Sequence, residues 1–177
     1  MIINTNSRIC EVSRSLQIEV DNDVLWGIIS SPGNLNYCHP YCKENNVEKW
    51  QGIDSRDSIT YYNGLTLNRE FIDWNEKKGY ELNIGKRKLA AANVLWEINA
   101  INNNASTLSI SIKLYSDVIL FKYLKVFRNM ITYFFLKPKM SAYINAVLRG
   151  FKHYAETTEP VQKNQFGYNS IFSTKNK

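Results

Sequence analysis

Two thiols and an imidazole lie within five positions of one another in the stretch NLNYCHPYCKENN. Cys38, His39 and Cys42 are all side chains that bind zinc, and two neighbouring thiols can also react as a redox pair. A third interpretation is a loop in which these side chains only shape the backbone and pack. Other residues of the chain decide whether this stretch is a metal site, a reactive thiol pair or a simple loop.

A structural zinc ion needs four ligands in tetrahedral geometry, usually from two separated pairs. The other candidates, Cys10 and His153, belong to no paired motif, and Pro40 stiffens the segment between the neighbouring groups. We therefore predict no metal site, a loop shaped by His39 and Pro40, and thiols that pack or stay idle. Three cysteines, an odd number, also give no disulfide framework, which is typical of a cytoplasmic protein.

Motifs for nucleophilic catalysis and for phosphate binding are absent from the sequence. It contains no Gly-x-Ser-x-Gly elbow and no glycine-rich phosphate loop. Any catalysis would then be general acid–base chemistry in an apolar pocket, where burial shifts pKa values. We predict that the protein needs no cofactor.

Arg14 is the first candidate for a charged group inside such a pocket. It lies in an alternating stretch, EVSRSLQIEV, and shares its parity with the apolar residues Val12, Leu16, Ile18 and Val20. We therefore expect a half-buried strand with Arg14 directed toward the core. A buried guanidinium needs a partner, either a carboxylate of the protein or an anionic group of a ligand.

The predicted strand 65–74 carries charges on both of its faces. Arg69 and Asp73 lie on one face, and Glu70 shares the other with Trp74. One face must therefore bury a charge, and the pattern alone does not decide which.

These residues are positioned by elements that the periodicity of the sequence predicts. A short helix begins near residue 21, a further helical turn ends at Pro40, and a long amphipathic helix covers 138–156. Between them, short loops connect strands into an antiparallel meander. The expected strands of the meander are 45–50, 57–62, 65–74, 80–84, 91–101 and 107–115.

The chain of 177 residues is long enough for one domain, which we place at 1–156, followed by a loop-like tail, 157–177, draped over the surface. Its net charge of +6 is uneven, because residues 117–177 carry 10 basic and 3 acidic side chains. Acidic lipid, an anionic ligand or nucleic acid would suit such a surface. No nucleic-acid motif accompanies it, so we expect no nucleic-acid partner.

Residues 118–136 are mostly apolar and nearly long enough to span a bilayer. Lys122, Lys125 and Arg128 lie in the middle, and each would cost roughly 2.5–3.5 kcal/mol at the centre of a membrane helix. We predict instead an extra apolar, basic helix before the last one. It would cover the mouth of a cavity, lie in a membrane interface through these basic side chains, or pack into the core.

The order of elements, a strand, two short helices, a meander and a long helix, resembles the START-like superfamily, also called SRPBCC. The matching stretches are LQIEVDNDVLWGIISSPGNLNYCHP, NREFIDWNEKKGYELNI, ANVLWEINAI and INAVLRGFKHYAE, within about residues 10 to 156. The superfamily includes polyketide cyclases, coenzyme Q-binding proteins and plant pathogenesis-related allergens. The resemblance implies an α+β helix-grip fold, with about seven antiparallel strands curved around the last helix.

The resemblance also implies a deep, mostly apolar cavity between the sheet and that helix. The ligand would then be hydrophobic or amphipathic, of lipid, isoprenoid or polyketide type. Our candidate ligand-binding residues are Arg14, Tyr61, Arg69, Trp96, Tyr143, Val147 and Phe151.

Three functions follow as expectations from the sequence. The first is binding of such a ligand in the cavity. The second is a cofactor-free cyclase or dehydratase that works by acid–base chemistry in the same place. The third is docking on a membrane surface, or self-association, through 118–136.

Overall fold

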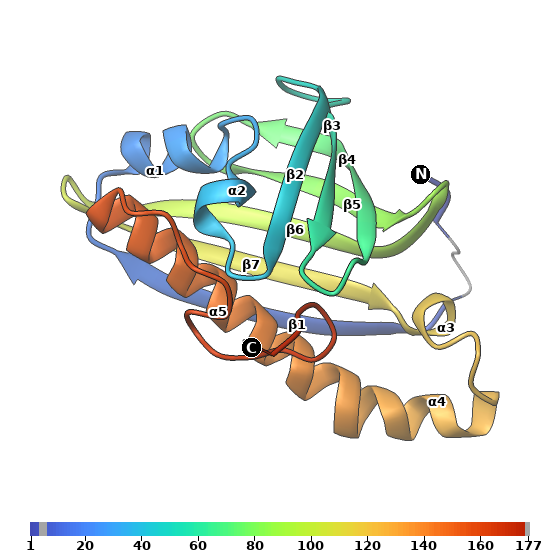
Figure 1. Ribbon diagram of the computed structural model, residues 1–177. Coiled ribbons are helices and arrows are strands. Elements are labelled where there is room, and N and C mark those ends of the chain that lie inside the picture. Colours follow the sequence, from blue (N-terminus) through green and yellow to red (C-terminus); the bar gives the residue numbers. More distant parts are fainter. Residues whose placement is uncertain (4–6, 176–177) are drawn as a thin grey trace.

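A curved, seven-stranded antiparallel sheet wraps around one long helix in the computed structural model, which describes residues 1–3 and 7–175 (Figure 1). The strand order is β1-β7-β6-β5-β4-β3-β2, so β2 to β7 form a meander and β1 joins it beside β7. The α+β helix-grip architecture expected from the sequence is confirmed. The strands are β1 (Ile9–Ile18), β2 (Cys42–Lys49), β3 (Arg56–Tyr61), β4 (Thr66–Asn75), β5 (Gly79–Lys86), β6 (Leu89–Asn102) and β7 (Ala105–Tyr115).

Two short helices follow β1, as predicted: α1 (Asn22–Ile29) and α2 (Leu35–Cys38). The carboxylate of Asp21 starts α1 by accepting a hydrogen bond from the backbone N–H of Val24 at 2.8 Å.

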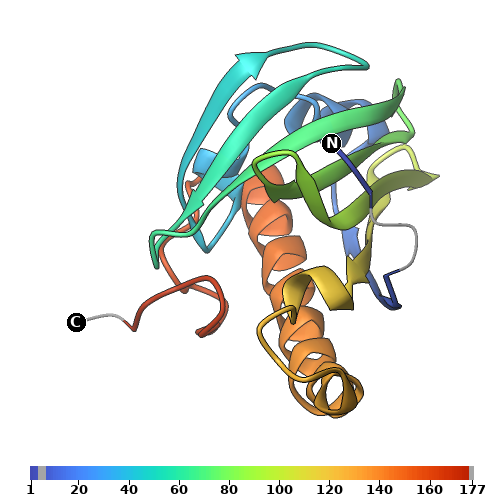
Figure 2. The same cartoon turned by 90° about the vertical axis from the view of Figure 1, so that its right-hand side faces the viewer.

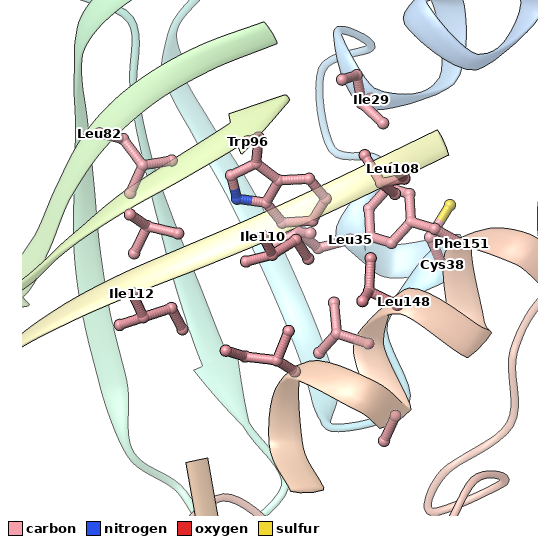
Figure 3. Close-up of a cluster of buried hydrophobic side chains, with 14 of the residues drawn as sticks. Ile29, Leu35, Cys38, Leu82, Trp96, Leu108, Ile110, Ile112, Leu148 and Phe151 are labelled. Carbon is pink, nitrogen blue, oxygen red and sulfur yellow. The ribbon is translucent and has the colours of Figure 1, made fainter. Parts of the chain in front are cut away.

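The concave face of the sheet is apolar because strand residues alternate between its two sides. Trp96 of β6 lies opposite Ile110 of β7, and Val94 lies opposite Ile112; all four are buried. Figure 3 shows these rows facing the long helix, where Phe151 packs edge-on against Trp96 with ring centroids 5.0 Å apart. Apolar residues also alternate along both stretches of the sequence, which predicts these rows, and the prediction is confirmed.

The long helix is longer than the sequence suggested. α5 (Lys137–Thr157) continues without a break from α4 (Lys125–Ile131) through a π-helical turn, η1 (Thr132–Leu136). Pro138 therefore lies inside a helix rather than at its start, and the wider turn before it accommodates a residue that has no N–H to donate.

The prediction of a separate helix over 118–136 is wrong. α3 (Ser116–Ile119) is one turn, the chain then leaves helical geometry, and α4 begins at Lys125. Residues 125–136 project beyond the sheet (Figures 1 and 2). Among the described residues, no helix is both long and apolar enough to cross a bilayer.

A buried ion pair joins two neighbouring strands on the concave side. Asp57 of β3 lies directly opposite Arg69 of β4, and the carboxylate accepts hydrogen bonds from Nε, at 2.6 Å, and from Nη2. A β-bulge between Phe71 and Asp73 then reverses the alternation. Asp73 is therefore exposed, and Trp74 turns back toward the aromatic core.

α5 touches the segment after α2 at a point where only glycine fits. A Cβ atom added to Gly150 would lie 2.2 Å from the carbonyl oxygen of Cys38 and 3.1 Å from Cδ of Pro40. Because that oxygen belongs to the backbone, it cannot move aside as a flexible side chain would. The contact fixes the loop that carries His39 against the helix.

Gly150→Ala should therefore destabilise the protein by about 1–3 kcal/mol, the usual cost of overpacking, although alanine favours helices. Gly27→Ala in α1 is the matched control, because nothing lies within 4 Å of its added Cβ. That variant should keep or slightly raise the stability. Urea unfolding of the three proteins measures the difference, and equal stability of the two variants would show that the contact is not tight.

Candidate functional site

A cavity of about 800 Å³ lies between the concave face of the sheet and the N-terminal half of α5. Its walls are apolar over most of their area. The apolar lining residues include Ile59, Leu82, Val94, Trp96, Ile110, Ile112, Leu136, Met140, Ile144 and Val147.

The cavity opens beside α3. The exposed side chains among its lining residues are Lys86 and Leu89, which flank the β5–β6 turn, and Phe121, which lies just after α3. The mouth is therefore next to the point where residues 125–136 leave the body of the protein.

Five of the seven candidate residues from the sequence lie in the wall of this cavity. They are Tyr61, Arg69, Trp96, Tyr143 and Val147. Phe151 does not line it, because its ring is buried behind Trp96.

The expectation that Arg14 is buried is wrong. Its side chain is exposed and donates hydrogen bonds to the carbonyl of Ser13 and to Oγ of Ser141 on α5, at 2.8 and 2.6 Å. It shares its side of the strand with buried Val12, as the alternation indicated. However, β1 is an edge strand, so a long side chain there reaches solvent past the helix.

Polar groups gather at one place in the cavity wall. The backbone N–H of Tyr41 donates to Nδ1 of His39 at 3.1 Å, and Nε2 of His39 lies 3.0 Å from the hydroxyl of Tyr143. That hydroxyl is 3.2 Å from the hydroxyl of Tyr61. Arg69, paired with Asp57, lines the cavity close to them.

Burial controls the protonation of these groups. It lowers the pKa of His39 to about 3, and the charge of Arg69 acts in the same direction. Burial also raises the pKa of Tyr61 to about 12 and that of Tyr143 well above its ordinary value. The imidazole and both phenols are therefore neutral at neutral pH.

The thiols of Cys38 and Cys42 are buried. Burial raises the pKa of Cys42 to about 12 and that of Cys38 further, so both stay protonated. Both ring nitrogens of His39 already have hydrogen-bond partners. These contacts agree with the interpretation in which the side chains shape the backbone and pack. Within residues 1–3 and 7–175, no cluster of metal-ligating side chains forms.

The tail after α5 belongs to the site, which the sequence did not indicate. Phe172 is buried, lines the cavity and packs on Tyr61 and Tyr143, with centroids 4.6 and 4.4 Å away. The amide of Asn169 donates to the backbone carbonyl of Lys139 and holds this segment on α5. The only sign in the sequence that the tail packs on the domain was a few apolar residues in a polar stretch. Residues 176 and 177 of the predicted tail lie outside the described residues.

Large apolar side chains are exposed around the projecting helix. Val126 is 77% and Phe134 83% exposed. We call this surface the apolar platform, and it consists of Phe121, Tyr123, Leu124, Val126, Phe127, Met130, Tyr133, Phe134 and Phe135.

The charges around the apolar platform are positive. No acidic residue occurs between Asp117 and Glu156, and Lys122, Lys125 and Lys137 are exposed. Arg128, expected to contribute, is instead mostly buried. It pairs with Asp117 at 2.9 Å and donates to the backbone carbonyls of residues 121 and 123, so it holds the segment before α4 in place.

No protein-family model and no curated protein matches this chain in sequence. Solved structures do match it in fold. The protein XoxI from Bacillus cereus superposes with a TM-score of 0.65 at 12% identity, over 84% of this chain and 97% of that one.

Two enzymes have similar structures. The Zhui aromatase/cyclase from Streptomyces sp. R1128 has a TM-score of 0.61 at 13% identity, over 87% of this chain and 100% of its own. A norcoclaurine synthase from Thalictrum flavum, solved with a transition-state analogue, has a TM-score of 0.58 at 9% identity, over 85% and 99%. The chain thus has the helix-grip fold of the START-like, or SRPBCC, proteins.

Proposed function

We propose that this protein binds a hydrophobic or amphipathic small molecule, of lipid, isoprenoid or polyketide type, in the cavity between the sheet and α5. The observation that carries the proposal is the cavity of about 800 Å³ with its mostly apolar wall. Its volume lies in the range of roughly 300–1,000 Å³ that is typical of small-molecule sites. A structure of the same fold that holds a transition-state analogue supports it.

A cofactor-free cyclase or dehydratase in the same cavity is the alternative function. Acid–base catalysis is most effective when the pKa of the catalytic group lies near the working pH. The pKa values of His39, Tyr61 and Tyr143 lie far from neutrality. None of the three is therefore suited to exchange a proton at neutral pH, which favours binding over catalysis.

The apolar platform supports a second proposal, that the protein docks on an anionic membrane surface. Exposed aromatic and aliphatic side chains surrounded by lysines match the composition of helices that lie in a membrane interface. Lysine side chains can extend along apolar neighbours and reach lipid head groups. Because Phe121 belongs both to the platform and to the cavity mouth, docking would bring the mouth to the lipid.

Val147→Trp should reduce binding of the neutral apolar dye N-phenyl-1-naphthylamine by at least about tenfold, because the indole would occupy space inside the cavity. Val147 is buried and lines the cavity, while its neighbour Asn145 is exposed on the same helix. Asn145→Trp is therefore the matched control and should bind the dye normally. Fluorescence titration measures both, and full binding by the Val147 variant would contradict the cavity as the binding site.

The membrane proposal predicts co-flotation of the protein with vesicles of equal parts phosphatidylglycerol and phosphatidylcholine, and much weaker binding to phosphatidylcholine alone. Lys122→Gln with Lys125→Gln should weaken binding by about tenfold or more, since a lysine near an anionic surface contributes about 1 kcal/mol. Added salt should reduce the binding of the unmodified protein.

Two controls separate a membrane from other partners of the apolar platform. Lys43→Gln with Lys78→Gln removes two exposed charges elsewhere and should bind vesicles normally. Val126→Ser with Phe134→Ser should lose binding with the fold intact. A dimer in sedimentation equilibrium that the serine variant abolishes, together with no vesicle binding, would assign the platform to a second copy of the chain.

A further inference from the structure

The hydrogen bonds at the polar end of the cavity have a direction that the backbone sets. The N–H of Tyr41 can only donate, so Nδ1 of His39 accepts its hydrogen bond and carries no proton. The proton of the neutral ring is then on Nε2, which donates to the hydroxyl oxygen of Tyr143. His39 thus donates a hydrogen bond to the hydroxyl of Tyr143 and does not accept one from it.

One phenolic proton remains without an acceptor. Tyr143 and Tyr61 carry one O–H each, and a single hydrogen bond of 3.2 Å joins the two oxygens. If Tyr143 donates to Tyr61, the proton of Tyr61 is left over; if Tyr61 donates, the proton of Tyr143 is left over. Neither hydroxyl has another acceptor among the described residues, and both tyrosines line the cavity. The cavity wall therefore offers a hydrogen-bond donor in either arrangement.

The polar end of the cavity has no net positive charge that could bind an anion. Asp57 binds two nitrogens of Arg69 from the adjacent strand and balances its charge. His39 and the two phenols are neutral. A carboxylate or phosphate placed here would lose its hydration without gaining an unpaired cation, which is unfavourable in an apolar surrounding.

We propose that the ligand carries a neutral hydrogen-bond acceptor, a carbonyl of ketone, ester or quinone type, attached to an apolar body, and that this carbonyl accepts the spare phenolic hydrogen bond at Tyr61 and Tyr143. The inference rests on the proposed binding function and narrows the class of ligand. An apolar body fits the remaining wall, and a free acid does not fit the polar end.

Competition with N-phenyl-1-naphthylamine tests this on the unmodified protein, with methyl laurate, laurate and tridecane as competitors of similar length. Methyl laurate should bind about three- to tenfold more tightly than tridecane, the ratio expected for one hydrogen bond. It should also bind at least tenfold more tightly than laurate, which is an anion at neutral pH.

A variant locates the preference for the ester. Tyr61→Phe combined with Tyr143→Phe should reduce the advantage of methyl laurate over tridecane to less than about twofold, because neither phenolic donor remains in the cavity wall. Tyr41→Phe is the matched control: its phenol donates to the carbonyl of Gly167 and does not line the cavity. The ester should keep its advantage in that protein, and circular dichroism checks that both variants fold.

The outcomes separate this inference from the binding function beneath it. Equal binding of the ester and tridecane, or tighter binding of laurate, would overturn the inference and leave the apolar cavity as the binding site. Displacement of the dye by none of the three competitors would overturn both. An ester preference that survives in the double variant would also overturn the assignment to these hydroxyls.

Discussion

The close contact between α5 and the segment after α2 is the constraint on which the rest of the site depends. Gly150 has no side chain, so the backbone of Cys38 can lie against the helix, where a Cβ would be 2.2 Å from its carbonyl oxygen. His39 is the next residue, and Tyr143 lies two helical turns before Gly150. The contact therefore brings an imidazole from one element to a phenol from another. It converts a stretch that resembles a metal or thiol site into the polar end of an apolar cavity.

The cavity combines features that belong to different parts of the chain. Strand alternation lines it with Val94, Ile110 and their neighbours, Trp96 lies in its wall with Phe151 packed behind it (Figure 3), and the exposed mouth adjoins α3. Polar groups inside are paired almost completely, so the proposed ligand would be recognised mainly through its shape and apolar surface. The exception is one phenolic proton. If the apolar platform beside the mouth docks on a membrane, as proposed, an apolar ligand would have a route that need not cross water.

Local patterns in the sequence predicted most of the fold and part of the site. A period of two placed Trp96 on the apolar face of its strand, and a period of 3.6 placed Val147 on the apolar stripe of the long helix, because these residues follow the regular geometry of their elements; both lie in the cavity wall. Features that depend on tertiary structure could not be predicted from such local patterns. The edge position of β1 exposes Arg14, and the partner of Arg69 is on the adjacent strand. Phe172 reaches the cavity from a segment without regular structure, which no periodicity reveals.

Native mass spectrometry of the purified protein, followed by denaturing release and identification of the bound compounds, tests the central claim most directly. The account predicts that, after incubation with a total lipid and apolar metabolite extract, the folded chain carries one additional mass. Denaturation should release that mass as an apolar small molecule, and Val147→Trp should lose it. A bare chain after the same incubation would contradict the claim that the cavity is a binding site.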